Sequence, residues 1–285
     1  MAAIEVRNLR KTFPNGHTAL ADISFSIPDG QFVCIVGRSG AGKSTLMRCL
    51  NGSLPVSAGD ALVGPHNISR LSDSGKRDLQ RSVGFIYQEF NLVGRLSALR
   101  NVLTGRLGYA SAWRSLAMYF NAEDRRIALD ALEQVGMLHK CLQRADSLSG
   151  GEKQRVAIAR AMAQQPKVLL ADEPVANLDP ELADDVLRDL RRVARQTGVT
   201  TLLNIHNIAQ AQRYADRMIG IAEGKVVFDG GPTDLDKDAL HRIYRFDRED
   251  ARAELAESLD PLVLLDLDRA LREGERRLTV QEEKV

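Results

Sequence analysis

The chain has 285 residues, of which 44% are hydrophobic and 27% charged, and its formal net charge is +1. This balance is ordinary for a globular protein with a sizeable core, and it gives no sign of a nucleic-acid partner. Three scattered cysteines are too few for a disulfide framework or a metal site, and the N-terminus lacks the apolar stretch of a secretion signal. No apolar run approaches the roughly 20 residues that cross a bilayer, so we expect any membrane role to be played from the cytosolic side through a partner.

The first elements in chain order are predicted strands. Apolar and polar residues alternate between residues 4 and 27, with turn signals at Asn15-Gly16 and Pro28-Asp29-Gly30, which predicts a small antiparallel sheet. The run from Phe32 to Val36 is fully apolar, which is typical of a strand buried in a parallel sheet. We interpret Cys34, within this run, as a buried structural thiol.

The pattern becomes helical from about residue 91 to residue 164 and then alternates between strands and helices. A helix is predicted at 180–196, where Asp179 is the expected N-cap and Gly198 the stop. The remaining predicted elements are two buried strands and one hairpin, at 168–171, at 200–205 and at 218–228. Strands that alternate with helices predict an α/β fold with a parallel sheet covered on both faces. The fold class is therefore α/β, with an N-terminal antiparallel β subdomain and an inserted helical subdomain at about 91–164.

A complete phosphate-binding motif follows the first buried strand: Gly37-Arg38-Ser39-Gly40-Ala41-Gly42-Lys43-Ser44, continued by Thr45. Glycines let the backbone amides wrap a phosphate, and the start of the predicted helix at 45–50 adds partial positive charge. We expect Lys43 to neutralise the β- and γ-phosphates and Ser44 to bind Mg²⁺. The P-loop fold is therefore predicted, although this motif alone does not choose between a kinase, a GTPase and an ATPase.

Two carboxylates follow the buried strand at 168–171. Asp172 stands at the carboxyl end of the strand, where an open α/β sheet binds ligands, and we expect it to hold Mg²⁺ through water. Glu173 lies just beyond the strand and is the predicted general base for a water that attacks the γ-phosphate.

A second helix start rich in backbone amides occurs at Leu148-Ser149-Gly150-Gly151-Glu152. One nucleotide needs only one phosphate loop, so this second predicted anion site requires an explanation. Here the sequence resembles the ABC transporter ATPases over roughly residues 1–245, and these five residues look like their signature motif. The resemblance implies a homodimer that binds ATP head to tail. Each ATP then lies between the phosphate loop of one subunit and Ser149, Gly150 and Gly151 of the other.

The same resemblance implies roles for four further residues. Phe13 stacks on adenine, and Gln88 senses Mg²⁺ and the membrane partner. Asp179 ends the loop Ala176-Asn177-Leu178-Asp179 that crosses the dimer interface, and His206 contacts the γ-phosphate. The implied catalytic set is thus Glu173, His206, Gln88 and Lys43, and the implied Mg²⁺ ligands are Ser44, Gln88 and Asp172.

A narrower resemblance is to the phosphonate-import ATPases, over the stretches 37–52, 90–120 and 144–180. It implies a subunit that lies on the cytoplasmic face of the membrane and docks on a permease through residues 101–116. A periplasmic or lipid-anchored binding protein then delivers the phosphonate. Asn177 and Asn207 depart mildly from the family pattern, and neither replaces a catalytic group.

Several alternatives remain open at this point. The cargo could instead be a phosphate-like anion or an amino acid, or the partner could be an exporter. A non-transport ABC ATPase and a small-molecule P-loop kinase are more distant readings. The segment 247–285 lies outside the expected nucleotide-binding domain, which spans 1–246. It contains an apolar patch flanked by charged residues. It is interpreted as a helix that binds a partner, as one that packs on its own domain, or as a disordered tail.

Overall fold

A computed structural model of the chain describes residues 2–109, 113 and 117–244. The strands are β1 (Ala2–Thr12), β2 (Thr18–Pro28), β3 (Phe32–Val36), β4 (Ala58–Val63), β5 (His66–Asn67), β6 (Val83–Ile86), β7 (Val168–Asp172), β8 (Thr200–Asn204), β9 (Arg217–Ala222) and β10 (Lys225–Gly230). The helices are α1 (Lys43–Leu50), α2 (Asp73–Ser82), α3 (Ala98–Leu103), α5 (Ala122–Gln134), α6 (Gly150–Met162), α7 (Pro180–Thr197), α8 (Ile208–Tyr214) and α9 (Lys237–Tyr244). Short 3₁₀ helices are η1 (Ile68–Arg70), η2 (Thr104–Tyr109), η3 (Leu138–Lys140), η4 (Ala145–Ser147) and η5 (Pro232–Asp234).

The strands form one mixed sheet in the order β5-β4-β1-β2-β10-β9-β3-β8-β7-β6. Strands β9, β3, β8, β7 and β6 pair in parallel, whereas β1, β2, β4 and β5 pair antiparallel. One ladder pair, Lys225 with Asp22, joins the two parts of the sheet. The predicted fold class is therefore confirmed, including the parallel core and the antiparallel N-terminal part.

Side chains of β3 alternate between two hydrophobic clusters, which explains why this strand is fully apolar. Phe32, Cys34 and Val36 pack with helices α3, α5, α6 and α7, and the intervening Val33 and Ile35 pack with α1 and the antiparallel strands. The structure thus confirms the buried setting of Cys34, and burial raises the pKa of its thiol above the ordinary value.

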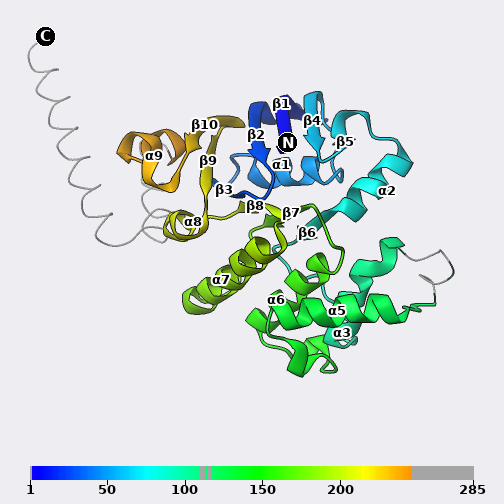
Figure 1. Cartoon of the computed structure of the whole chain (residues 1–285). Helices are drawn as coiled ribbons and strands as arrows, with labels where there is room; N and C mark the ends of the chain where they lie inside the picture. Colours follow the sequence, from blue (N-terminus) through cyan, green and yellow to red (C-terminus); the bar gives the residue numbers. More distant parts are fainter. Residues whose placement is uncertain (1, 110–112, 114–116, 245–285) are drawn as a thin grey trace, which may run out of the picture.

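Helices occupy the described part of residues 91–164, and α3, α5 and α6 gather below the sheet in Figure 1. Helix α7 begins after Asp179 and ends at Gly198, whose φ of 68° is the left-handed conformation expected of a helix stop. In the hairpin β9–β10, the turn residues Glu223 and Gly224 also have positive φ. These three features agree with the residues that predicted them.

Residues 101–116, which the family resemblance implies dock on a permease, include both buried and exposed side chains. Asn101 is 1% exposed and Arg106 is 7% exposed. Asn101 accepts a hydrogen bond from Val93 N, and Arg106 forms an ion pair with the buried Asp124. Both side chains therefore make contacts inside the helical region. In the described part of this stretch, the exposed residues are Gly108, Tyr109 and Trp113. The segment 247–285 lies outside the described residues.

Candidate nucleotide-binding site

The phosphate loop connects β3 to α1, and two of its glycines have no room for a side chain. Gly37 has φ 152° and Gly42 has φ 105°. A Cβ at Gly37 would lie 2.2 Å from Ile221 O, and one at Gly42 would lie 2.4 Å from Ala19 O. Backbone of neighbouring strands therefore presses against the loop from both sides, and only glycine permits this path.

Lys43 is the first residue of α1 and is 4% exposed. Its ammonium donates hydrogen bonds to the loop carbonyls Gly37 O at 2.6 Å and Arg38 O at 2.9 Å. The N-cap of α1 is Gly42, which provides no side-chain hydrogen bond to the helix amides. The loop thus places a cation beside a helix start that has no side-chain cap, which is the arrangement that attracts phosphate.

Ser44 and Asp172 meet beside this loop. Ser44 Oγ donates to Asp172 Oδ1 at 2.9 Å, although the two residues come from α1 and from the end of β7. Asn204, the last residue of β8, donates from Nδ2 to the same Oδ1 at 2.6 Å. A hydroxyl and a carboxylate side by side are the oxygen donors that Mg²⁺ prefers, so these two residues fit the expected metal.

Glu173 follows β7 with a φ of 51°, a left-handed conformation that is uncommon for a residue with a side chain. Its Oε1 lies 2.7 Å from His206 Nε2 and 3.3 Å from Asn204 Nδ2. The hydrogen bond from His206 is the main cause that lowers the pKa of Glu173 below its ordinary value of 4.5, while partial burial acts the other way. The carboxylate is therefore ionised at neutral pH and able to accept a proton.

A cavity of about 220 Å³ brings most of these groups together. It is lined by Phe13, His17, Ala19, Ser39, Gly40, Gly42, Lys43, Ser44, Thr45 and Glu173. The ring centroids of Phe13 and His17 are 6.3 Å apart and their planes differ by 11°. The cavity thus combines a phosphate cradle with an aromatic wall, as a nucleotide requires. Gly37, Arg38 and Ala41 belong to the same loop but do not line this cavity.

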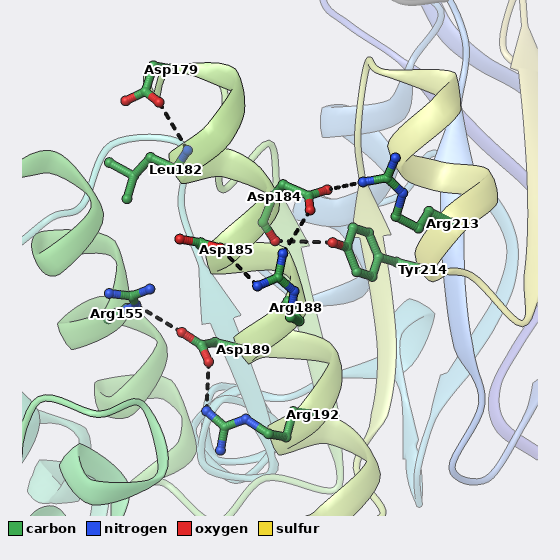
Figure 2. Close-up of polar contacts among 10 residues, drawn as sticks. All are labelled: Arg155, Asp179, Leu182, Asp184, Asp185, Arg188, Asp189, Arg192, Arg213 and Tyr214. Atoms are coloured by element: carbon green, nitrogen blue, oxygen red, sulfur yellow. Dashed lines mark hydrogen bonds and ion pairs between the residues drawn. The ribbon is translucent and has the colours of Figure 1, made fainter. Parts of the chain in front are cut away.

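Three other predicted site residues lie outside this cavity, two of them at helix starts and one after a strand. Ser149, the N-cap of α6, and Asp179, the N-cap of α7, are both exposed and do not line the cavity. Figure 2 shows Asp179 accepting a hydrogen bond from Leu182 N at the first turn of α7, at 3.0 Å. Gln88 is also exposed, just after β6, and is not among the lining residues. The chain therefore gathers only part of the expected site around one cavity.

Two residues of the site were not found by sequence reasoning. No sequence motif points to His17, because its place beside Phe13 is set by the turn at 13–17, in which Phe13 N donates to His17 O. Asn204 is fully buried and holds both carboxylates of the site. The available signal for Asn204 was an amide side chain at the end of a predicted buried strand, because such a side chain needs buried hydrogen-bond partners.

The phosphate loop, the paired carboxylates and the parallel sheet define a P-loop nucleotide-binding protein. Residues 20–176 match the family model described as ABC transporter. The chain is 43% identical over 244 residues to the phosphonates import ATP-binding protein PhnC of Staphylococcus aureus, which covers 86% of this chain and 95% of that protein. The relative of the same name in Staphylococcus haemolyticus is 44% identical over the same shares. The chain belongs to the ABC transporter family and is an ATPase subunit of that family.

Solved structures agree with this assignment. A dimeric post-hydrolysis state of the ATP-binding cassette MJ0796 bound to ADP and Pi is 30% identical, with a TM-score of 0.69 over 80% of this chain and 98% of that one. The cbiO1 protein of Clostridium perfringens, part of an ABC transporter complex, is 28% identical with a TM-score of 0.74 over 88% of this chain. Within the described residues, no helix is both long and apolar enough to cross a membrane.

Proposed function

We propose that this chain is the energy-coupling subunit of an ABC importer for phosphonates, and that it hydrolyses ATP at sites shared between two copies of itself. One observation supports the proposed dimer. The cavity that contains the phosphate loop and Glu173 does not include Ser149 or Gly151, although both belong to the family signature. A second copy placed head to tail supplies them.

The chemistry follows from the residues around the cavity. Phe13 supports the adenine, and Lys43 together with the amides at the start of α1 neutralises the phosphates. A bound Mg²⁺ supplies further charge neutralisation, and Ser44 and Asp172 are the residues that hold it. Glu173 takes a proton from water, whose oxygen bonds to the γ-phosphorus as the bond from this phosphorus to ADP breaks. His206 orients the Glu173 carboxylate and contacts the γ-phosphate.

The partner chain completes each site. Ser149, Gly150 and Gly151 of one copy meet the γ-phosphate held by the other, and Asp179 lies along the same interface. ATP binding closes the dimer and hydrolysis lets it reopen. This motion is passed through Gln88 to a separate permease, so the chain works on the cytoplasmic face of the membrane.

The phosphonate cargo is supported by the relatives. The PhnC proteins match this chain over 95% of their own length, and their name assigns them to phosphonate import. The alternatives are import of a different anion or of an amino acid, and export. The identity of the permease distinguishes between them. Our candidates for contact with that permease are Tyr109 and Trp113, whose exposed fractions are 40% and 82%.

The test is to purify the chain from membranes of its own source and to identify the membrane protein that comes with it. ATPase activity of that complex in lipid should rise when a binding protein loaded with phosphonate is added, and should not rise with the same protein loaded with phosphate or unloaded. Stimulation only by another class of solute would refute the cargo and leave the ATPase assignment intact. Co-purification of ribosomes in place of a permease would refute the role in transport.

A further inference from the structure

The signature helix α6 begins with a reciprocal pair of hydrogen bonds between its N-cap and its third residue. Glu152 N donates to Ser149 Oγ at 3.4 Å, and Ser149 N donates to Glu152 Oε2 at 3.0 Å. The serine hydroxyl acts as an acceptor in this cap, so its own proton is left to donate outward. The Glu152 carboxylate, for its part, fixes the backbone at the serine.

The second oxygen of that carboxylate forms an ion pair with a lysine from another element. Lys140, at the end of η3, approaches Glu152 Oε1 with its ammonium at 2.5 Å. The lysine and glutamate side chains are 31% and 22% exposed, so the pair is half-buried. The hydrogen bond from Lys140 is the largest cause that lowers the pKa of Glu152 below its ordinary value, followed by the hydrogen bond from the Ser149 amide.

This pair lies where the proposed function requires a phosphate. The start of a helix attracts an anion through its amides and its partial positive charge. A carboxylate at the third helical position, however, already satisfies part of that attraction and repels a second anion. With Glu152 alone, the signature would therefore be a poor partner for the γ-phosphate of the opposite copy. The ammonium of Lys140 offsets this repulsion.

We propose that Lys140 is a positioning residue for the signature motif, which cancels the charge of Glu152 and orients its carboxylate so that Ser149 can receive the partner's γ-phosphate. This inference rests on the proposed head-to-tail dimer. Lys140 itself touches neither nucleotide nor reacting atoms. It acts through Glu152, and its effect is exerted on the ATP held by the opposite subunit.

The test compares Lys140→Met with the double variant Lys140→Met/Glu152→Gln, both made in full-length chains that carry Glu173→Gln to slow turnover. ATP-driven dimerisation is measured by analytical ultracentrifugation. At an effective dielectric constant of about 20, one unpaired charge within roughly 10 Å of a phosphate changes binding on the order of tenfold. Lys140→Met should therefore weaken dimerisation at least tenfold. The parent is the chain that carries Glu173→Gln alone. The dimerisation constant of the double variant should return to within about threefold of the parent's, because the double variant leaves no unpaired charge.

Two controls separate this role from a structural one. ATP affinity of the dilute monomer should not change in Lys140→Met, because its own phosphate loop is intact. Lys225→Met removes the same charge from an exposed position on β10 and should dimerise like the parent. A Lys140→Met chain that dimerises like the parent, or a double variant that stays as weak as Lys140→Met, would overturn the inference alone. A parent that stays monomeric with ATP would overturn the proposed dimer and the inference together.

Discussion

Replacing Glu173 by glutamine removes a proton acceptor and changes little else in the structure. Glutamine has nearly the same shape, and its carbonyl oxygen is able to accept the hydrogen bonds from His206 and Asn204 that now reach Oε1 at 2.7 and 3.3 Å. The left-handed backbone at this position costs a glutamine no more than a glutamate. Any loss of rate therefore reports the missing base and not a collapsed site.

The expected loss is between about 10² and 10⁴ in kcat, the range found for one positioned general base, which corresponds to about 3–5 kcal/mol of activation free energy. Phosphate release is measured at saturating ATP and Mg²⁺, and ATP-dependent dimerisation is measured on the same sample. The variant should bind ATP normally and accumulate as a dimer. Glu223→Gln is the matched control, because Glu223 also has a positive φ, of 50°, but lies in the β9–β10 turn.

The pH dependence of the wild-type enzyme checks the same reasoning. Because the pKa of Glu173 is lowered in the folded chain, its carboxylate contributes stability above the ordinary value of 4.5 and loses it as pH falls through the folded pKa. Protonation of Glu173 should therefore reduce the rate only below pH 4.5. A kcat for Glu173→Gln within threefold of wild type, or a loss of activity by Glu173 protonation near neutral pH, would contradict the role given to this residue.

Three further predictions concern other parts of the site. Lys43→Ala should weaken ATP binding by tenfold or more in calorimetry, because it removes the cation beside the phosphates, and unchanged affinity would argue against the cradle. Asp179→Ala should lower the free energy of unfolding by about 1 kcal/mol through loss of the α7 cap, and a denaturant titration that shows no change would refute this. Arg155→Met breaks a half-buried ion pair of 2.9 Å with Asp189 (Figure 2), and should also cost about 1 kcal/mol, since Arg192 still pairs with that carboxylate. A double-mutant cycle with Asp189→Asn measures this coupling, and a coupling energy near zero would contradict it.

The parts of the fold that the sequence predicted are those with a strong local signal. Strand β3 and helix α7 were located within a residue or two, because one is apolar throughout and the other has a cap, a periodic face and a stop. The elements β4, β5, β6, α2, α8 and α9 were not predicted. Strand β6 has four residues and α8 has seven, so neither is long enough for a period to stand out.

The site shows the same division between local motifs and contacts across the sheet. The phosphate loop and the carboxylates were predicted from contiguous residues with a defined chemistry. His17 and Asn204 were not, because each acquires its place from pairing with a distant strand or from a turn. Asn207, one of the departures from the family pattern, has a local explanation after all: its side chain caps α8 by accepting a hydrogen bond from Gln210 N at 3.0 Å.

The two anion-binding helix starts of the proposed composite site are capped differently, and this difference suits a dimer that must close and reopen. The N-cap of α1 is Gly42, which has no side-chain hydrogen bond to the helix among the described residues, so a bound phosphate would satisfy amides at this helix start. At the start of α6, the amides of Ser149 and Glu152 already donate to each other's side chains, and Glu152 is paired with Lys140. Phosphate therefore gains more at α1 than at α6. We expect nucleotide to stay with its own phosphate loop when the dimer reopens, and to leave the signature of the partner first.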